Sequence, residues 1–558
     1  MTRQRRQAVV VVHGMGEQRP VETLNAFSTV ICRGAPFHSR PVKFRGDFEG
    51  RLHVVPARRK DEPDAAGHGF DVQTDIYEYH WAHLMQGNRL DDLWPTFRRI
   101  MLPSTSIPQL VVAVGLLLVA IGAAGLLLFP LDGLPEWAPW TLGTIGVVAL
   151  LAFGATQLPH VPPGLWGLWI VIWIATFALA WGFVSIPGFS TWFGVPPWAQ
   201  IAAGSVSALV VVTYAISRLL PGWLVKYLVD VVRYLDTSPR SFAARREIRT
   251  GIVDLLQALH DSGDYDRIVV TGHSLGSYIA YDAISYLWST TSSRGGGLSA
   301  ESLEAVEAAA SDLAEDPTRS ADDYRRAQRD LWLAMRAQGH PWLISDFVSF
   351  GSPMNFADQI YTKDTAQFAA RMDLRELQSC PPQSETADEH DEKWPPQYRP
   401  NANAHSTFFS YVTHDKRTRG DGGAFWRHTR RLHEAAAFAP VRWTNMWYPA
   451  RWHFFGDWFG GSLRRLYGAG IADIELTGDA PRSRIPGYAH GVYVTTRDYD
   501  TDGAFAKEFR RALDLESGAW LPAPRDKKAA STSSGDMDPA PDSAVPAAPA
   551  QPSRPVAP

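Results

Sequence analysis

No lysine or arginine occurs between residues 101 and 217, and this long stretch constrains the fold more than any other feature of the chain. Its only acidic residues are Asp132 and Glu136. Within it lie four apolar segments, each close to the roughly 17–25 residues that a helix needs to cross the hydrocarbon core of a bilayer; they span residues 110–129, 142–158, 165–186 and 201–220. Core helices of soluble proteins rarely lack charge over such a length. The sequence therefore predicts a transmembrane helical block over residues 101–222.

Basic residues flank this block on both sides. Arg98 and Arg99 precede it, and further basic residues follow it: Arg218, Lys226, Arg233, Arg240, Arg245 and Arg246. Because positively charged flanks of membrane helices stay in the cytoplasm, we expect both flanks and both termini there, which requires an even number of crossings. Four crossings satisfy this requirement. Two crossings remain an alternative, because glycines interrupt the short second segment at Gly143, Gly146 and Gly154.

The rest of the composition excludes several classes of function. The net charge of -4 gives no basic excess, so no nucleic-acid partner is expected. The chain has 2 cysteines, too few for a disulfide framework and without metal-ligand spacing. The histidines form no compact ligand motif either. We expect neither a metal nor an organic cofactor.

The segment RIVVTGHSLGSYIAYDAI, residues 267–284, is typical of a strand that turns sharply into a helix. Residues 267–270 are apolar or β-branched apart from the first, and residues 277–288 have the apolar face of a helix. Between them, Gly272 and Gly276 allow a turn that is too tight for a Cβ atom. This context presents Ser274 as a nucleophile at a helix N-terminus, with the backbone N–H of Leu275 as a donor to an oxyanion.

A second motif strengthens this interpretation. Residues 9–18, VVVVHGMGEQ, read as a buried strand that ends in His-Gly-Met-Gly. With this motif the chain resembles the α/β-hydrolase superfamily, specifically its lipase-like members. The resemblance covers residues 5–100 and 225–515 and implies an α/β fold, with a mostly parallel sheet flanked by helices. It also implies that the amide of Met15 is the second oxyanion donor. For His13 and His273 we expect packing around the loops rather than a part in the reaction.

The resemblance further implies a triad in the chain order Ser, acid, His. His490 lies in a loop-like stretch near the end of the folded region, between Gly487 and Gly491, and we predict that it is the base. Four other histidines have weaker cases, because they lie in a polar, arginine-rich stretch where no strand ending is evident: His405, His414, His428 and His433.

Two carboxylates compete for the role of the acid. Asp457 follows an apolar strand predicted at residues 441–448, where the triad order expects the acid. Asp358 follows a strand predicted at residues 346–353, a position that some lipase-like enzymes use. Position in the triad order favours Asp457.

The domain organisation follows from these elements. Residues 1–100 and 223–515 are expected to form the two parts of one hydrolase domain, with a helical insertion near 296–340. A helix predicted at residues 244–263 leads into the strand that carries the nucleophile. Residues 522–558, rich in Pro, Ala and Ser, are predicted to be disordered. Because both parts must meet in one sheet, they must lie on the same side of the membrane, in agreement with the charged flanks.

The predicted function is that of a membrane-anchored serine hydrolase. It is expected to act on carboxylic esters, lipid or lipid-like, through Ser274, His490 and Asp457 and an acyl-enzyme. Its partners are the bilayer and the ester substrate. Two alternatives remain: acyl transfer to an acceptor other than water, and a non-catalytic membrane scaffold on a hydrolase fold. A transporter is disfavoured, because the apolar segments carry no charged residue at mid-membrane.

Overall fold

The computed structural model describes residues 5–14, 21–32, 38–43, 49–55, 72–85, 234, 239–294, 298, 300–360, 362, 364–384, 408–418, 424–450, 456–457, 459–477, 488–491, 493 and 503–514. The predicted transmembrane block (101–222), the predicted oxyanion donor Met15 and the predicted disordered tail (522–558) lie outside these residues. Among the helices of the described part, none is both long and apolar enough to span a bilayer.

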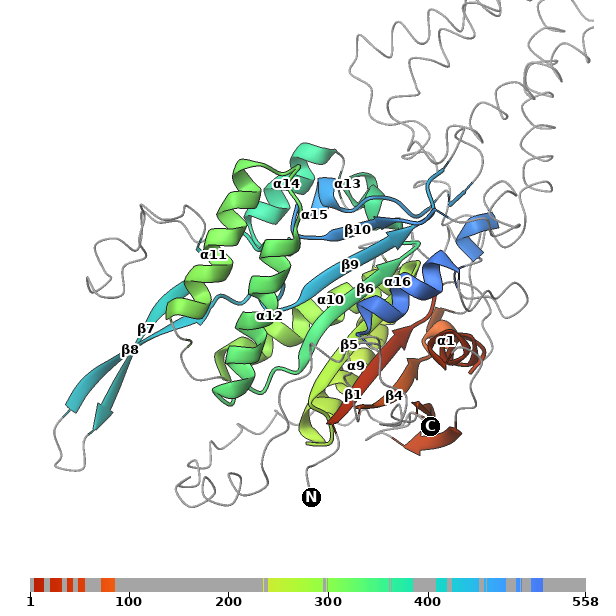
Figure 1. The fold of residues 1–558 in the computed structure, drawn as a ribbon, viewed down its shortest axis with the longest axis horizontal. Helices are drawn as coiled ribbons and strands as arrows, with labels where there is room; N and C mark the ends of the chain where they lie inside the picture. Colours follow the sequence, from red (N-terminus) through yellow and green to blue (C-terminus); the bar gives the residue numbers. More distant parts are fainter. Residues whose placement is uncertain are drawn as a thin grey trace, which may run out of the picture.

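A sheet of eight strands forms the centre of the described fold, in the order β10-β9-β6-β5-β1-β4-β3-β2 (Figure 1). The six strands from β10 to β4 are parallel, and β3 and β2 continue the sheet antiparallel. The expectation of a mostly parallel sheet in an α/β fold is confirmed. The strands are β1 (Arg5–Val12), β2 (His38–Lys43), β3 (Glu49–Val55), β4 (Val72–Tyr79), β5 (Arg267–His273), β6 (Ile344–Phe350), β9 (Arg442–Trp447) and β10 (Ala472–Glu475).

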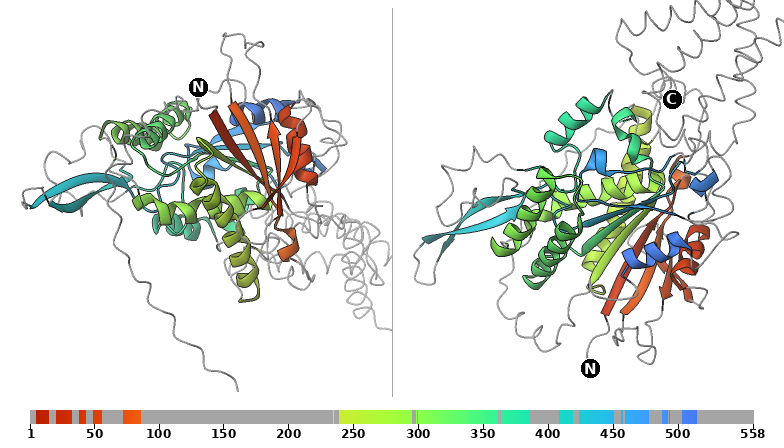
Figure 2. Two further views of the ribbon diagram at one scale, coloured as in Figure 1. Left: turned by 90° about the horizontal axis from the view of Figure 1, so that it is seen from below. Right: turned by 45° about the horizontal axis from the view of Figure 1, so that its top comes forward.

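Helices cover both faces of the sheet (Figure 2). One face is covered by α9 (Pro239–Asp261), α10 (Leu275–Thr291), α11 (Ala300–Glu315) and α12 (Asp322–Ala337), and the other by α1 (Glu22–Cys32) and α16 (Ala504–Ala512). The shorter helices are α13 (Ala357–Ile360), α14 (Thr365–Asp373), α15 (Arg464–Tyr467), and the 3-10 turns η1 (Ala82–Met85), η5 (Ser292–Arg294), η6 (Pro353–Phe356) and η10 (Tyr488–Gly491).

The apolar run of β1 reflects its position inside the sheet. Ala8, Val10 and Val12 belong to the core under α9 and α10, whereas Val9 and Val11 belong to the core under α1 and α16. All of these side chains are fully buried. A parallel strand covered on both faces reads as a continuous hydrophobic run rather than an alternating one, which explains the unbroken apolar run at residues 8–12 of β1.

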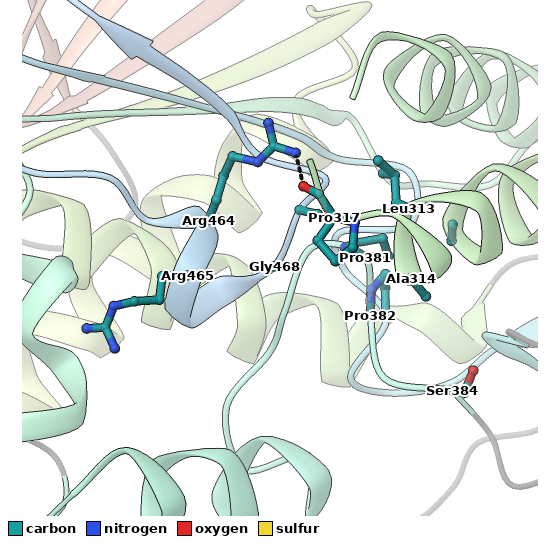
Figure 3. A pocket seen from close by; sticks show the side chains of 11 residues that line it. Leu313, Ala314, Pro317, Pro381, Pro382, Ser384, Arg464, Arg465 and Gly468 are labelled. Carbon is teal, nitrogen blue, oxygen red and sulfur yellow. Dashed lines mark hydrogen bonds between the residues drawn. The ribbon is translucent and has the colours of Figure 1, made fainter. Parts of the chain in front are cut away.

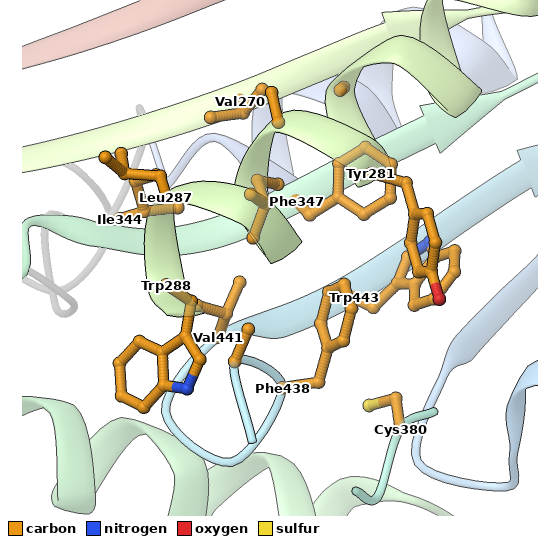
Figure 4. Packing of buried hydrophobic residues seen from close by; sticks show 14 of the residues in the cluster. Val270, Tyr281, Leu287, Trp288, Ile344, Phe347, Cys380, Phe438, Val441 and Trp443 are labelled. Carbon is orange, nitrogen blue, oxygen red and sulfur yellow. The ribbon is translucent and has the colours of Figure 1, made fainter. Parts of the chain in front are cut away.

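An aromatic cluster supports the α10 face of the sheet (Figure 4). The rings of Phe347 on β6 and Trp443 on β9 are 5.1 Å apart, and Phe438 stacks on Trp443 at 4.8 Å. Tyr281 on α10 packs against the same tryptophan at 5.6 Å. Close-packed rings of this size resist displacement, so α10 and the turn at its N-terminus are fixed relative to the sheet.

The two parts of the chain that flank residues 101–222 meet in this sheet. Strand β1 pairs in parallel with β4, which precedes those residues, and with β5, which follows them. Across the same junction the hydroxyls of Tyr77 and Tyr265 are 2.5 Å apart. The hydroxyl of Tyr79 donates to the carbonyl of Ile248 on α9 at 2.7 Å. The sheet is therefore continuous across the long intervening segment.

Some elements differ from those expected. Helix α9 begins at Pro239, five residues before the predicted start at 244, because proline suits the first turn of a helix, where no N–H partner is required. The region 296–340 contains helices α11 and α12, in agreement with the helical insertion expected there, but it is not a solvated polar segment, because α12 buries Tyr324, Leu331 and Trp332 in the core. Strands β7 (Ser410–Thr418) and β8 (Ala424–Leu432), which had no counterpart in the sequence reading, form a hairpin that projects from the body (Figure 1).

Candidate active site

Ser274 lies in the turn between β5 and α10, at the carboxyl edge of the sheet. Its backbone has φ 52° and ψ -127°, in a region that non-glycine residues rarely occupy. Its N–H donates to the carbonyl of Phe350, at the end of β6, at 3.1 Å. Strain of this kind persists only where the surroundings hold it, and it is the geometry by which a strand-to-helix turn exposes a serine hydroxyl.

The glycines on either side of this turn allow the close contact of strand and helix. A Cβ atom on Gly272 would lie 2.6 Å from the carbonyl oxygen of Gly276, and one on Gly276 would lie 2.3 Å from the carbonyl oxygen of Val12. Both distances are far below any real Cβ contact, and the atoms approached are backbone atoms that have no freedom to move aside. The start of α10 is therefore pressed against the end of β1.

The three residues predicted to act together are joined by hydrogen bonds. The Nε2 atom of His490 is 2.9 Å from the Oγ atom of Ser274, and its Nδ1 atom is 3.0 Å from Oδ1 of Asp457. All three are almost completely buried, with exposed fractions of 0% for Ser274, 1% for His490 and 0% for Asp457. The three residues come from turns after β5, β9 and β10, all of which end at the same edge of the sheet.

Asp457 is held by donors on both of its oxygens. The backbone N–H of Phe459 donates to Oδ1 at 2.8 Å, and the hydroxyl of Tyr493 donates to Oδ2 at 2.9 Å. Burial alone raises the pKa of a carboxyl, but attraction to His490, the hydrogen bond with its ring and backbone N–H donors outweigh burial, so the pKa of Asp457 is lowered. Asp457 is therefore an ionised carboxylate at neutral pH, as a partner of an imidazolium must be.

Asp358, the rival candidate, has different partners. Its Oδ2 accepts a hydrogen bond from the hydroxyl of Thr365 at 2.8 Å and lies 3.3 Å from the guanidinium of Arg465. The carboxylate beside the Nδ1 atom of His490 is that of Asp457. Of the two alternatives left open by the sequence, Asp457 is the one that the fold brings to the histidine.

Of the two predicted oxyanion donors, the structure describes Leu275 but not Met15. Leu275 is the first residue of α10, directly after Ser274, so its N–H lies at the positive end of the helix dipole. Met15 lies outside the described residues, but the preceding Gly14 is described. A Cβ atom on Gly14 would lie 2.8 Å from Nδ1 of His273 and 3.1 Å from Cβ of Ser274. The loop after β1 thus begins in contact with Ser274.

His13 connects the end of β1 to the end of β4. Its Nδ1 atom donates to the carbonyl of Gly14 at 2.7 Å, so Nε2 is free to accept from the backbone N–H of Trp81 at 3.2 Å. The indole of Trp81 stacks on this ring and donates to the carbonyl of His13 at 3.0 Å. Burial lowers the pKa of His13 to about 3, so the ring is neutral and serves packing, as we expected.

His273 hydrogen-bonds to the backbone of His490, and its ring lies 5.2 Å from the ring of His490. Its Nε2 atom is 3.1 Å from the carbonyl oxygen of His490, and its ring stacks on Phe350 at 5.1 Å. Desolvation, followed by the nearby His490, lowers the pKa of His273 to about 3. The neutral ring donates its Nε2 proton to that carbonyl, because a carbonyl oxygen can only accept.

Two supporting groups were missed by the sequence reasoning. Tyr493 accepts a hydrogen bond from the backbone N–H of Tyr448 at 2.9 Å while it donates to Asp457, so it joins the segments after β9 and β10. Ser277 hydrogen-bonds to the carbonyl of Ser274 and to the hydroxyl of Ser352, 2.6 Å away. The bonds of Tyr493 and the bond between Ser277 and Ser352 have no local signal in the sequence, because each joins segments that are distant along the chain. The bond from Ser277 to Ser274, three residues apart, is local.

A separate hollow of about 600 Å³ lies between the loop joining α11 to α12, the proline pair Pro381 and Pro382, and α15 (Figure 3). Its walls are mostly apolar, and Arg464 donates from its rim to the carbonyl of Pro317 at 2.9 Å. None of Ser274, His490 and Asp457 lines this hollow. Among the described residues, no group of three or more His, Cys, Asp or Glu side chains is arranged to hold a metal ion.

Comparison with known proteins adds no relative: no family model, no curated protein and no solved structure matches this chain.

Proposed function

We propose that this chain is a membrane-anchored serine hydrolase of the α/β-hydrolase superfamily that cleaves carboxylic esters of lipid or lipid-like substrates. The observation that carries the proposal is the hydrogen-bonded sequence Ser274–His490–Asp457 at 2.9 and 3.0 Å. The residues occur in the chain order nucleophile, acid, histidine, each after a strand of the parallel sheet. That order and the strained serine turn support an α/β-hydrolase fold over other parallel-sheet folds.

The geometry suits covalent acyl transfer. As the Oγ atom of Ser274 attacks the ester carbonyl, its proton passes to Nε2 of His490. Asp457 accepts the hydrogen bond from Nδ1–H, which holds the ring in the required tautomer and stabilises the imidazolium. The alcohol leaves after it takes the proton from His490. Water then attacks the acyl-enzyme with His490 as the base, which releases the acid and restores Ser274.

The oxyanion is assigned to two backbone donors. The N–H of Leu275 follows the nucleophile at the N-terminus of α10. The N–H of Met15 is proposed as the second donor, and contact between Gly14 and Ser274 supports a loop position within reach. Each such donor contributes typically about 2.7–4 kcal/mol of transition-state stabilisation.

Anchoring in the membrane is proposed from residues 101–222. Four apolar segments without charge at mid-membrane, between basic flanks, favour four crossings with both flanks in the cytoplasm. The continuity of the sheet supports an even number of crossings, because β4 and β5 pair with the same strand β1 from opposite ends of this block. Two strands of one sheet cannot lie on opposite sides of a bilayer.

The catalytic proposal is tested by labelling with a fluorophosphonate, which reacts with activated serines. We expect membranes containing the full chain to take the label, Ser274→Ala to take none, and His490→Ala or Asp457→Asn to react slower by a factor on the order of 10³–10⁴. Asp358→Asn is the matched control, because its carboxylate pairs with Thr365 and Arg465. A folded wild-type protein that takes no label would contradict the proposal.

The anchoring proposal has its own test. We expect the chain to stay with the membrane after an alkaline carbonate wash and to leave it only in detergent. A membrane-impermeant maleimide should reach Asp132→Cys, between the first two apolar segments, from outside the cell and not from the cytoplasm. Release by carbonate, or labelling from the cytoplasmic side, would overturn the predicted topology without affecting the serine chemistry.

A further inference from the structure

An aromatic and cationic patch lies on the first half of α9 and the adjacent part of α10. Phe242, Arg246 and Arg249 recur at intervals of four and three residues, so they form one stripe along α9. Arg249 lies over the ring of Tyr286 on α10, with its guanidinium carbon 5.1 Å from the ring centre. We call these four residues the α9–α10 patch.

The fold does not account for the exposure of this patch. Helix α9 packs on the sheet through a different set of side chains, all buried: Ile248, Ile252, Leu255, Leu256 and Leu259. Phe242 is 58% exposed and Tyr286 is 48% exposed, and among the described residues only Leu374 joins them as a large exposed hydrophobic side chain. Two of the three therefore fall on one small surface, where water contact costs free energy.

The charge of this surface is unfavourable for the helix that carries it. The segment 239–249 contains four arginines and one glutamate, and the first turn of α9 has no acidic residue. A helix N-terminus carries a partial positive charge, so cations in the first turns oppose the dipole. Arg245 is compensated by Asp282 at 2.9 Å. In the described part of the chain, Arg246 and Arg249 form no ion pair with a carboxylate. An anionic partner would neutralise these two cations and would also interact favourably with the positive end of the helix dipole.

The chain connectivity brings this patch close to the proposed bilayer. The last apolar segment ends at residue 220, and Tyr234 is already buried against the domain, where its hydroxyl donates to Asp282 at 3.1 Å. The 14 residue steps from position 220 to position 234 reach at most about 50 Å when extended and about 21 Å when helical. Arg245, next to the patch on α9, contacts the same carboxylate of Asp282.

We propose that the α9–α10 patch lies on the anionic headgroup layer of the bilayer, with Phe242 and Tyr286 at the interface and Arg246 and Arg249 on lipid phosphates; this rests on the membrane anchoring proposed above. Aromatic rings prefer the membrane interface, and arginines next to anionic lipids are attracted to the surface. The patch combines both on a single face, which favours a lipid surface over a soluble anion.

This orientation also indicates where the substrate comes from. Helix α9 ends near the amino edge of the sheet, where the N–H of Asp266 donates to the carbonyl of Arg6 at 2.9 Å. The beginning of α9 therefore lies toward the carboxyl edge, where Ser274 and His490 are found. A bilayer in contact with that end of α9 faces the same edge, so the ester is a lipid that resides in the bilayer.

The test measures contact with lipid at the two ends of α9. The full chain, with Cys32→Ser, is reconstituted in vesicles of phosphatidylcholine with or without phosphatidylglycerol, and a bimane label is attached at Phe242→Cys. The second native cysteine, Cys380, is buried and its pKa is raised by burial to about 12, so it does not take the label. The matched control is Asp261→Cys, which is exposed at the other end of the same helix, about 28 Å away.

We expect lipids with a nitroxide headgroup to quench the label at position 242 and not at position 261. Quenching should be strongest with phosphatidylglycerol and should fall at least about fivefold in Arg246→Glu/Arg249→Glu. Arg326→Glu, which changes an arginine 68% exposed on α12, should leave quenching unchanged. Equal quenching at positions 242 and 261, or no quenching at position 242, would overturn the proposal that the α9–α10 patch lies on the bilayer.

Failure of the patch and failure of the proposed function give different results. If the patch is wrong and the hydrolase proposal is right, fluorophosphonate still labels Ser274 in the vesicles while position 242 is not quenched. If the anchoring itself is wrong, carbonate releases the protein from the vesicles, which also overturns the patch. If quenching occurs as expected but no serine is labelled, the contact with lipid stands and catalysis does not.

Discussion

At the scale of single residues, the three residues of the proposed triad had signals in the sequence, but the residues that support them did not. Ser274 lies in a glycine-flanked turn after an apolar strand, and His490 and Asp457 follow in the order expected from the resemblance. The bond from His273 to the carbonyl of His490 joins residues 217 positions apart, so no local pattern announces it. The same holds for Tyr493, whose hydroxyl reaches Asp457 across 36 positions.

His273 is predicted to position the base. In His273→Phe the ring still packs on Phe350, but the N–H that fixes the backbone of His490 is lost. We expect labelling of Ser274 by fluorophosphonate to slow about tenfold, as the loss of one net hydrogen bond implies. His273→Gln keeps an N–H donor and should recover most of the rate. Equal rates for wild type and His273→Phe, or equal losses in both variants, would show that His273 only fills space.

At the scale of elements, strands made of apolar runs were predicted from the sequence, whereas the polar strands of the β7–β8 hairpin were not. The expected strands at 267–270, 346–353 and 441–448 correspond to β5, β6 and β9, because each is buried on both faces. The hairpin β7–β8 is rich in arginine and has no apolar run, so its pairing left no such signal. Charged residues also occur inside the sheet: Asp346 on β6 lies 2.5 Å from Arg267 and 2.5 Å from Arg442.

This charged cluster should contribute strongly to the stability of the sheet. Asp346→Asn leaves the guanidinium groups of Arg267 and Arg442 buried next to a neutral partner. We expect the free energy of unfolding to fall by about 3–5 kcal/mol, measured by urea denaturation. Asp323→Asn, which removes the partner of Arg326 in a pair that is 78% and 68% exposed, should change it by less than about 1 kcal/mol. Similar losses in both variants would contradict this account.

At the scale of the whole molecule, the order of strands could not be read from the sequence. The resemblance implied that both halves join one sheet, but it did not give β1 as the strand between them or the antiparallel pair β3 and β2 at the edge.

Burial also makes the stability of the whole molecule depend on pH. Desolvation lowers the pKa of four histidines to between about 3 and about 4: His13, His260, His273 and His340.

The domain should therefore lose stability in acid. A histidine whose pKa is lowered by folding takes up its proton first in the unfolded chain, so its contribution is complete above pH 6.5 and declines toward pH 3–4. Burial raises the pKa of Glu78 to about 7, which acts in the opposite sense as the pH rises from about 4.5 to 7. Each unit of pKa shift changes the free energy of unfolding by about 1.4 kcal/mol. We therefore expect the loss of stability from the four histidines to exceed the gain from the one glutamate as the pH falls.

Thermal unfolding of the full chain in detergent checks this expectation. The midpoint should fall steadily from pH 7 to pH 5. His340→Gln, far in the sequence from the residues of the candidate active site, should make the midpoint depend less steeply on pH. The variant lacks one imidazole that is neutral in the folded domain and takes up a proton when the chain unfolds. A midpoint that is constant or rises over this interval would contradict the role of the histidines.

The position of β1 between β4 and β5 has a consequence for how the chain is made. Tyr77 and Tyr265, which touch in the finished sheet, are separated by 188 residues. At a synthesis rate of roughly 5–20 residues per second, the ribosome needs on the order of 10–40 s to supply β5 after β4 is complete. During that interval one side of β1, whose residues 8–12 are all apolar, has no neighbour, a state that invites pairing with other chains. If the intervening block enters the membrane as it is synthesised, insertion of helices must precede closure of the sheet.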